Sequence, residues 1–194
     1  MLEGGLFGAD VPPGFRYRPD VITADEERTL AAQIAAVEFS AFEMRGVIAK
    51  RRVAFFGRSY DHNGRPTPPI PAFLIPYRDR LAEWIGIAPG EFAMALINEY
   101  REGAPIGWHR DAPQYDLVAG ISLLSACRMK LRPYVSPKNL AAATGTRRTA
   151  THEITLEPRS AYLLSGEART DYEHHIPPAA SPRYSITFRT LRGN

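Results

Sequence analysis

Two histidines and one aspartate have the residue types and spacing of a metal site. His109 and Asp111 are separated by one residue, so on an extended strand both project from one face and Arg110 from the other. A second imidazole from a distant strand, such as that of His174, would complete a set of two histidines and one carboxylate. That set suits non-haem Fe(II) and leaves coordination positions open for a co-substrate and dioxygen. A His-x-Asp pair is also common on solvated loops, so its neighbours decide its meaning.

Two further segments carry polar groups in strand-like register. Asn98 and Tyr100 share one face of a strand that ends at residue 100 and offer an amide and a phenol. In the last strand, one face holds polar or charged residues and the other is apolar: Arg183, Ser185, Thr187 and Arg189 against Tyr184, Ile186 and Phe188. Because the apolar face fixes the strand, both guanidinium groups point the same way. Surface arginines could do the same, but arginine binds carboxylates bidentately, and the pattern favours a buried clamp for a diacid.

The order of these motifs resembles that of the AlkB-like Fe(II)- and 2-oxoglutarate-dependent dioxygenases, over about residues 45 to 190. The stretch 163–169, Leu-Leu-Ser-Gly-Glu-Ala-Arg, and the following His174-x-Ile176-Pro177 belong to the same pattern. The resemblance implies an enzyme that uses Fe(II), 2-oxoglutarate and O2, with the iron held by His109, Asp111 and His174. It also implies that Arg183, supported by Tyr100 and Ser185, binds the distal carboxylate of 2-oxoglutarate. Arg189 and Asn98 would lie near the end of 2-oxoglutarate that chelates the metal.

Two of these assignments involve a choice between alternatives. His174 and His175 are adjacent, so only one can face the metal, and the family spacing that ends in His-x-Ile-Pro selects His174. Arg169 could contact the substrate beside the iron, or could pair with a carboxylate such as Asp111 or Glu167.

Basic and aromatic residues between 45 and 65 indicate where the substrate would bind. The segment 51–60 combines arginines with aromatic rings, and AlkB-like enzymes carry their nucleotide-recognition lid at this position. Unpaired bases stack on such rings. Val53 and Phe55 alternate as a core-facing strand would, so the candidate substrate-binding residues are Arg51, Arg52, Phe56 and Tyr60, together with Arg169.

The charge distribution agrees with an anionic partner, although the net charge is only +3. A second stretch, 117–151, contains six basic residues and no acidic one before Thr151. Two basic stretches can form an electrostatic footprint for nucleic acid, or can simply solvate strand edges and loops. Within the second stretch, 136–150 is expected to be an exposed hairpin loop, as either a tolerated insertion or an arm that grips substrate.

Length and composition predict one domain over residues 1–194. With 44% hydrophobic residues the chain can bury a core, and its single cysteine, Cys127, allows neither an intramolecular disulfide nor a cysteine-based zinc site. We expect a cytoplasmic protein, because no signal peptide and no membrane-spanning run is visible. We also expect it to be a monomer. Within the domain, 1–44 would form an N-terminal extension with a helix, 45–70 the lid and 90–190 the core.

The periodicity predicts an α+β fold. A capping box at Thr23-x-x-Glu26 opens a helix continued by Leu30, Ile34 and Val37, and a second amphipathic helix ends at Gly86. Strands are expected near 92–100, 106–111, 118–124, 127–134, 152–157, 160–165 and 184–190. The resemblance implies that they form a double-stranded β-helix (jelly-roll) core with the N-terminal helices packed outside.

The function expected from these features is oxidative demethylation of N-alkylated bases in DNA or RNA, as in alkylation repair. The target would be a single strand or a base flipped out of a duplex. Two departures from the DNA-repair members lie where a base would be read: Ala112-Pro113 replaces a second acidic residue, and Tyr172 replaces a tryptophan. The alternatives are hydroxylation of a modified tRNA base or of a protein side chain, and a nucleic-acid-binding module without catalysis.

Overall fold

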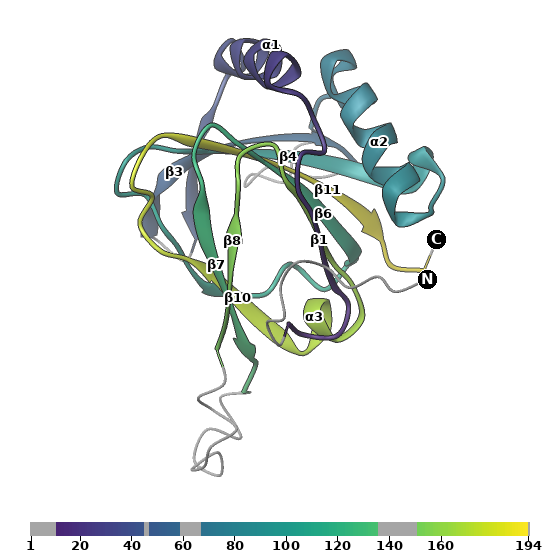
Figure 1. Cartoon of the computed structure of the whole chain (residues 1–194), viewed down its shortest axis with the longest axis vertical. Coiled ribbons are helices and arrows are strands. Elements are labelled where there is room, and N and C mark those ends of the chain that lie inside the picture. The colour runs from purple at the N-terminus through teal and green to yellow at the C-terminus, as the bar shows by residue number, and fades with distance from the viewer. Residues whose placement is uncertain (1–10, 45–46, 59–66, 136–150, 194) are drawn as a thin grey trace.

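Two antiparallel sheets face each other in the computed structural model, which describes residues 11–44, 47–58, 67–135 and 151–193 (Figure 1). The larger sheet has seven strands in the order β1-β9-β6-β11-β4-β3-β2. They are β1 (Phe15–Arg18), β9 (Ala161–Leu164), β6 (Tyr115–Leu123), β11 (Arg183–Leu191), β4 (Phe92–Tyr100), β3 (Val47–Gly57) and β2 (Ser40–Met44). The smaller sheet has the order β5-β10-β7-β8: β5 (Ile106–His109), β10 (Tyr172–Ile176), β7 (Cys127–Pro133) and β8 (His152–Leu156). This is the expected jelly-roll core.

Both expected N-terminal helices form and cover the outer face of the larger sheet, above it in Figure 1. Helix α1 (Ala24–Ala35) begins at Thr23, whose hydroxyl accepts from the Glu26 backbone N–H while the Glu26 carboxylate accepts from the Thr23 N–H. Helix α2 (Ile75–Ile85) follows the 3-10 turn η1 (Ala72–Leu74) and ends at Gly86, which has φ +83°. The left-handed conformation explains why glycine stands there. A second 3-10 turn, η2 (Pro89–Glu91), leads into β4.

Residue parity in β11 decides what lies on each side of the larger sheet. Ile186 and Phe188 pack with α1 and α2 in the outer core. Arg183, Ser185, Thr187 and Arg189 are buried on the opposite, inner face, as their alternation predicts. Residues paired across neighbouring antiparallel strands share one face. Strands β4, β6 and β9 therefore extend both the outer face, toward the helices, and the inner face, toward the smaller sheet. The space between the sheets is therefore lined by the polar face of β11.

The strands expected from the sequence did not include β1, β2, β3 or β10, and neither the two 3-10 turns nor the short helix α3 (Gly166–Thr170) was expected. Strand β10 has the sequence Tyr-Glu-His-His-Ile, in which polar residues hide the apolar alternation. Strand β5 is shorter than expected and ends at His109, so Asp111 lies in the turn that follows. Strand β3 extends through half of the expected lid and pairs with β4 from Arg52 to Gly57. In the described part of the chain, no helix is long and apolar enough to cross a membrane.

Candidate active site

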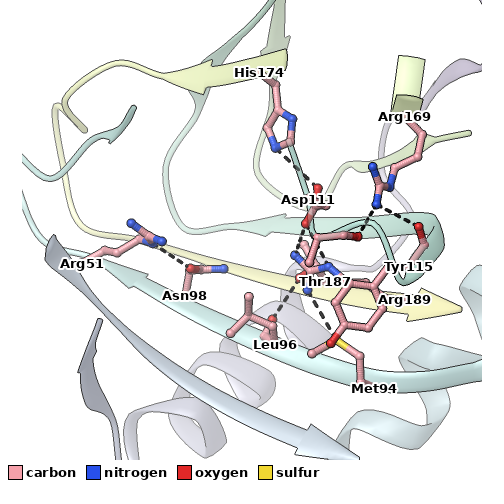
Figure 2. Close-up of polar contacts among 11 residues, drawn as sticks. Arg51, Met94, Leu96, Asn98, Asp111, Tyr115, Arg169, His174, Thr187 and Arg189 are labelled. Carbon is pink, nitrogen blue, oxygen red and sulfur yellow. Dashed lines mark hydrogen bonds and ion pairs between the residues drawn. The ribbon is translucent and has the colours of Figure 1, made fainter. Parts of the chain in front are cut away.

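His109, Asp111 and His174 meet between the two sheets. Strands β5 and β10 pair with His174 directly opposite His109, and the two ring centroids are 4.2 Å apart. Asp111, in the turn after β5, brings Oδ2 to 3.8 Å from His174 Nε2. Figure 2 shows the His174 ring pointing from β10 toward this carboxylate. The tertiary structure thus gathers the three residues that the sequence singled out.

Electrostatics keep this donor set in the form that a metal needs. Burial, reinforced by the charge of His109, lowers the pKa of His174 to about 3, and burial also lowers the pKa of His109. Both imidazoles are therefore neutral at physiological pH. Burial alone would raise the pKa of Asp111, but Arg189 holds it well below its usual value. Two neutral imidazoles and one carboxylate fit Fe(II).

Backbone and side-chain contacts orient the candidate ligands. The His109 Nδ1 contacts the Gly107 carbonyl oxygen at 2.9 Å; since a carbonyl only accepts, this nitrogen carries the proton and Nε2 is free for a metal. Arg189 donates from Nη2 and Nε to Asp111 Oδ1 at 2.6 and 3.0 Å, which leaves Oδ2 available. Within the described ranges, no three His, Cys, Asp or Glu side chains converge closely enough to hold a metal ion as they stand, so His109, Asp111 and His174 would have to draw closer together around one.

The neighbouring histidine faces elsewhere. His175 Nδ1 lies 2.6 Å from the Ile106 carbonyl oxygen, and its ring packs on Trp108 with centroids 5.1 Å apart. Of the two adjacent histidines, the structure therefore places His174 beside His109 and Asp111. This agrees with the choice made from the His-x-Ile-Pro spacing.

Arg183 is buried with its guanidinium only partly satisfied. Its Nε donates to Ser122 Oγ at 3.1 Å, whereas Nη1 and Nη2 have no hydrogen-bond partner and the residue is 1% exposed. Tyr100 lies directly across the strand pair, with its ring centroid 5.0 Å from the guanidinium carbon. Burial raises the pKa of the Tyr100 phenol, so it stays protonated. Two unpartnered buried donors are costly, and their geometry fits a carboxylate held bidentately.

The other expected co-substrate residues lie along the same inner face. Ser185 and Asn98 are buried and paired in register, and Asn98 Oδ1 accepts from Arg51 Nε at 3.2 Å. Arg189 stands at the Asp111 end, where Nη1 also donates to Thr187 Oγ1 at 3.0 Å (Figure 2). The two arginines therefore occupy opposite ends of one interior strip. Ser122, which holds Arg183, carried no motif and was missed.

A pocket of about 870 Å³ opens over His109 and Asp111. This volume is that of a typical ligand site. Both sheets contribute to its lining, including Phe42, Arg51, Trp108, Arg110, Tyr134, Arg169, Glu173 and Arg192. Sequence reasoning did not select Phe42, Trp108, Arg110, Tyr134 or Arg192. Trp108 and Arg110 flank His109, so their place beside the metal motif was the available signal.

The five expected substrate residues have different locations. Arg51 lines the pocket with its guanidinium carbon 4.1 Å from the Phe42 ring centroid. Arg52 is a correction: it points to the opposite face of β3, where Nη2 is 2.8 Å from Glu99 Oε1. Phe56 is a second correction, because it is buried in the outer core against the helices and cannot stack on a base. Tyr60 lies outside the described residues.

Arg169 lines the pocket, but its guanidinium is already held. Nη2 donates to the Ala112 and Tyr115 carbonyl oxygens at 2.6 and 2.8 Å (Figure 2). Neither carboxylate considered from the sequence is its partner in these bonds. The contacts tie α3 to the segment after Asp111, which positions that metal-ligand candidate.

The basic residues of β7 are less available than their number suggests. Arg128 and Lys130 lie 3.1 and 3.2 Å from the Glu153 carboxylate of β8, and Arg132 lies 2.6 Å from that of Glu173 in β10. The expected loop at 136–150 lies outside the described residues.

Sequence comparisons with known proteins identify the family. Residues 16–189 match the family model of the 2OG-Fe(II) oxygenase superfamily. The alkylated DNA repair protein ALKBH8 homolog of Arabidopsis thaliana is 28% identical over 211 residues, which cover 94% of this chain and 59% of that protein. The uncharacterized protein L905 of Acanthamoeba polyphaga mimivirus is 26% identical over 198 residues, which cover 92% of this chain and 85% of that protein. This chain thus spans little more than half of the Arabidopsis relative.

Solved structures share the fold. The structure of OsALKBH1 matches with a TM-score of 0.66 at 14% identity, covering 93% of this chain and all of that one (100%). A Pseudomonas putida prolyl-4-hydroxylase matches with a TM-score of 0.60 at 16% identity, covering 93% and 94% of the two chains. The family uses Fe(II), 2-oxoglutarate and O2, and the donor set and the unpartnered Arg183 nitrogens fit that requirement. The protein therefore belongs to the 2OG-Fe(II) oxygenase superfamily, and it is similar in sequence to an ALKBH8 homolog and in fold to OsALKBH1.

Proposed function

We propose that this dioxygenase removes N-linked alkyl groups from bases in single-stranded or locally opened DNA or RNA. The observation that carries the proposal is the charge of the pocket. Its two carboxylates, Asp111 and Glu173, are each paired with an arginine outside the pocket lining, Arg189 and Arg132. The arginines of the lining, by contrast, have no carboxylate partner among the described residues. The pocket is therefore cationic, as a polyphosphate chain requires.

The positions of individual arginines support a nucleotide. The Arg51 guanidinium carbon lies 4.1 Å from the Phe42 ring centroid, and burial lowers the pKa of Arg51. An arginine keeps its charge in proteins. On the smaller sheet, the Arg110 guanidinium carbon is 3.6 Å from the Tyr134 ring centroid, and Nη1 donates to the Thr170 carbonyl oxygen at 3.0 Å. Close cation–aromatic pairs provide both a charge for phosphate and an aromatic surface for stacking.

The residues of the site would have different roles in the reaction. His109, Asp111 and His174 would hold Fe(II), which with 2-oxoglutarate and O2 supplies the oxidising power for a C–H bond while 2-oxoglutarate becomes succinate and CO2. On an N-methyl group, insertion of one oxygen atom gives N–CH2OH, which releases formaldehyde and leaves N–H on the base. Arg189 keeps the Asp111 carboxylate oriented and ionised. The residues of the interior strip, from Arg183 to Arg189, are buried between the two sheets.

The Arabidopsis relative is named for alkylated DNA repair, which agrees with the proposal. Hydroxylation of a modified tRNA base or of a protein side chain is the alternative class of reaction. Cytoplasmic location and a monomeric state stay predictions, and so do the domain boundaries.

Formaldehyde release from defined oligonucleotides tests the proposal. Iron-loaded protein with 2-oxoglutarate should act faster on single strands containing N1-methyladenine or N3-methylcytosine than on unmodified strands, and binding should weaken as salt rises. If a preparation that turns over 2-oxoglutarate neither binds nor demethylates these strands, the proposal is wrong and the alternative class takes its place.

Adjacent arginines of β3 provide a matched pair of variants. Arg51→Ala should weaken oligonucleotide binding and reduce the salt dependence by about one counterion, because one phosphate contact is lost. Arg52→Ala should leave binding unchanged, since Arg52 lies on the opposite face and pairs with Glu99. Equal effects of the two substitutions would remove Arg51 from the substrate path.

A further inference from the structure

Tyr162 is a buried residue of β9 that neither a motif nor the proposed function uses. It is 6% exposed and belongs to the core between the two sheets. Its place can be read from the strand register: Tyr162 pairs with Gly120 of β6, and Gly120 pairs with Thr187 of β11. These three residues therefore form one row across the inner face of the larger sheet.

Gly120 allows the Tyr162 side chain to lie flat across β6. A Cβ atom at position 120 would stand 2.5 Å from Cε1, 2.6 Å from Cζ and 2.8 Å from the hydroxyl oxygen of Tyr162. The phenol end of the ring thus lies over Gly120, and the side chain extends from β9 toward β11. Only glycine leaves this space.

The row of Tyr162 lies between the rows of the two arginines. Along β11, Thr187 is two residues from Arg189 and four from Arg183, but the Arg183 side chain reaches back to Ser122, which is two residues from Gly120. Two residues along a strand span roughly 7 Å. The Tyr162 hydroxyl therefore lies along the strip that joins the unpartnered Arg183 nitrogens to the Asp111–Arg189 pair.

We infer that Tyr162 is a co-substrate-binding residue, whose hydroxyl donates a hydrogen bond to the distal carboxylate of 2-oxoglutarate beside Nη1 and Nη2 of Arg183. The Asp111 carboxylate is not the acceptor, because its Oδ1 is bound by Arg189 and its Oδ2 faces the metal site. Burial, with the charge of Asp111, raises the pKa of the Tyr162 phenol, so the proton to be donated is always present. A carboxylate is the strongest acceptor for such a donor.

Calorimetric titration measures this contact without turnover. Protein loaded with Mn(II) in place of Fe(II) is titrated with 2-oxoglutarate and, separately, with succinate, which keeps the distal carboxylate but lacks the keto acid. Tyr162→Phe should weaken the affinity for both ligands by about 10- to 100-fold, the value of one hydrogen bond to a charged group. Mn(II) affinity and the melting temperature of the ligand-free protein should stay unchanged.

Two further variants separate a contact from packing. Gly120→Ala displaces the phenol and should weaken both ligands as Tyr162→Phe does, whereas Tyr77→Phe removes a buried phenol from the helix side of the sheet and should change neither affinity. Unchanged affinities in Tyr162→Phe would show that the ring only packs. Weakening of 2-oxoglutarate alone would place the contact at the keto-acid end and overturn the assignment. The inference rests on the family's co-substrate and not on the nucleic-acid proposal, so each can fail separately.

Discussion

We expect Arg183 to have two opposite effects: it lowers the stability of the ligand-free protein, and it strengthens the binding of the co-substrate. Arg183→Met keeps an unbranched side chain and removes the charge. In the ligand-free state it loses the hydrogen bond to Ser122, worth about 1 kcal/mol, but it also removes two unpartnered buried donors that cost about 1–3 kcal/mol each. The variant should therefore be at least as stable as the natural protein.

Binding should show the opposite effect. A bound carboxylate would be left without its partner in Arg183→Met, which costs on the order of 3–5 kcal/mol, or about 10²- to 4 × 10³-fold in 2-oxoglutarate affinity. Urea unfolding without ligand gives the stability, and calorimetry on Mn(II)-loaded protein gives the affinity.

Arg159→Met is the control, because this arginine has a carboxylate partner. Arg159 Nη1 lies 3.1 Å from Glu27 Oε2, and Glu27 also accepts from the Leu124 backbone N–H. Its replacement leaves a largely buried carboxylate unpaired, so it should destabilise the fold and spare 2-oxoglutarate affinity. The reasoning would be refuted if Arg183→Met were as unstable as Arg159→Met and still bound 2-oxoglutarate normally.

Two other predictions concern the metal site and the N-terminal helix. Under anaerobic conditions, protein with Fe(II) and 2-oxoglutarate should show a visible charge-transfer band that is lost in Asp111→Ala and His174→Ala but kept in His175→Ala; the reverse order for the histidines would exchange their roles. Glu26 has its pKa lowered to about 2, chiefly by its hydrogen bonds to Arg80, so its carboxylate stabilises the fold above about pH 4.5 and this contribution disappears as the pH falls toward 2. After allowance for solvent at this partly exposed pair, Glu26→Gln should cost about 1 kcal/mol at pH 7 and almost nothing near pH 2, measured by urea unfolding at both pH values; an equal cost at both would exclude the ion pair as the cause.

The sequence alone was sufficient to predict an element and the direction of its side chains where one face of the element is apolar and the other is polar. The alternation in β11 determined which face carries Arg183 and Arg189, and the capping box with its apolar stripe determined α1. Asp111 lies beside His109, as the His109-x-Asp111 spacing predicts, even though β5 ends before Asp111. Arg189 holds the Asp111 carboxylate in this position.

On strands that are covered on both faces, only the tertiary structure shows which side chains point to the inner face and which to the outer face. In β3, Val53 packs toward the inner face and Phe56 toward the helices, so the apolar pattern could not tell which arginine faces the pocket. Register with β4 settled it, placing Arg51 beside Asn98 and Arg52 beside Glu99. Strand β9 is buried throughout and has no alternation to read. A side chain in such a strand acquires its role from the partners across the sheet, and these are fixed by strand pairing rather than by neighbours in the chain.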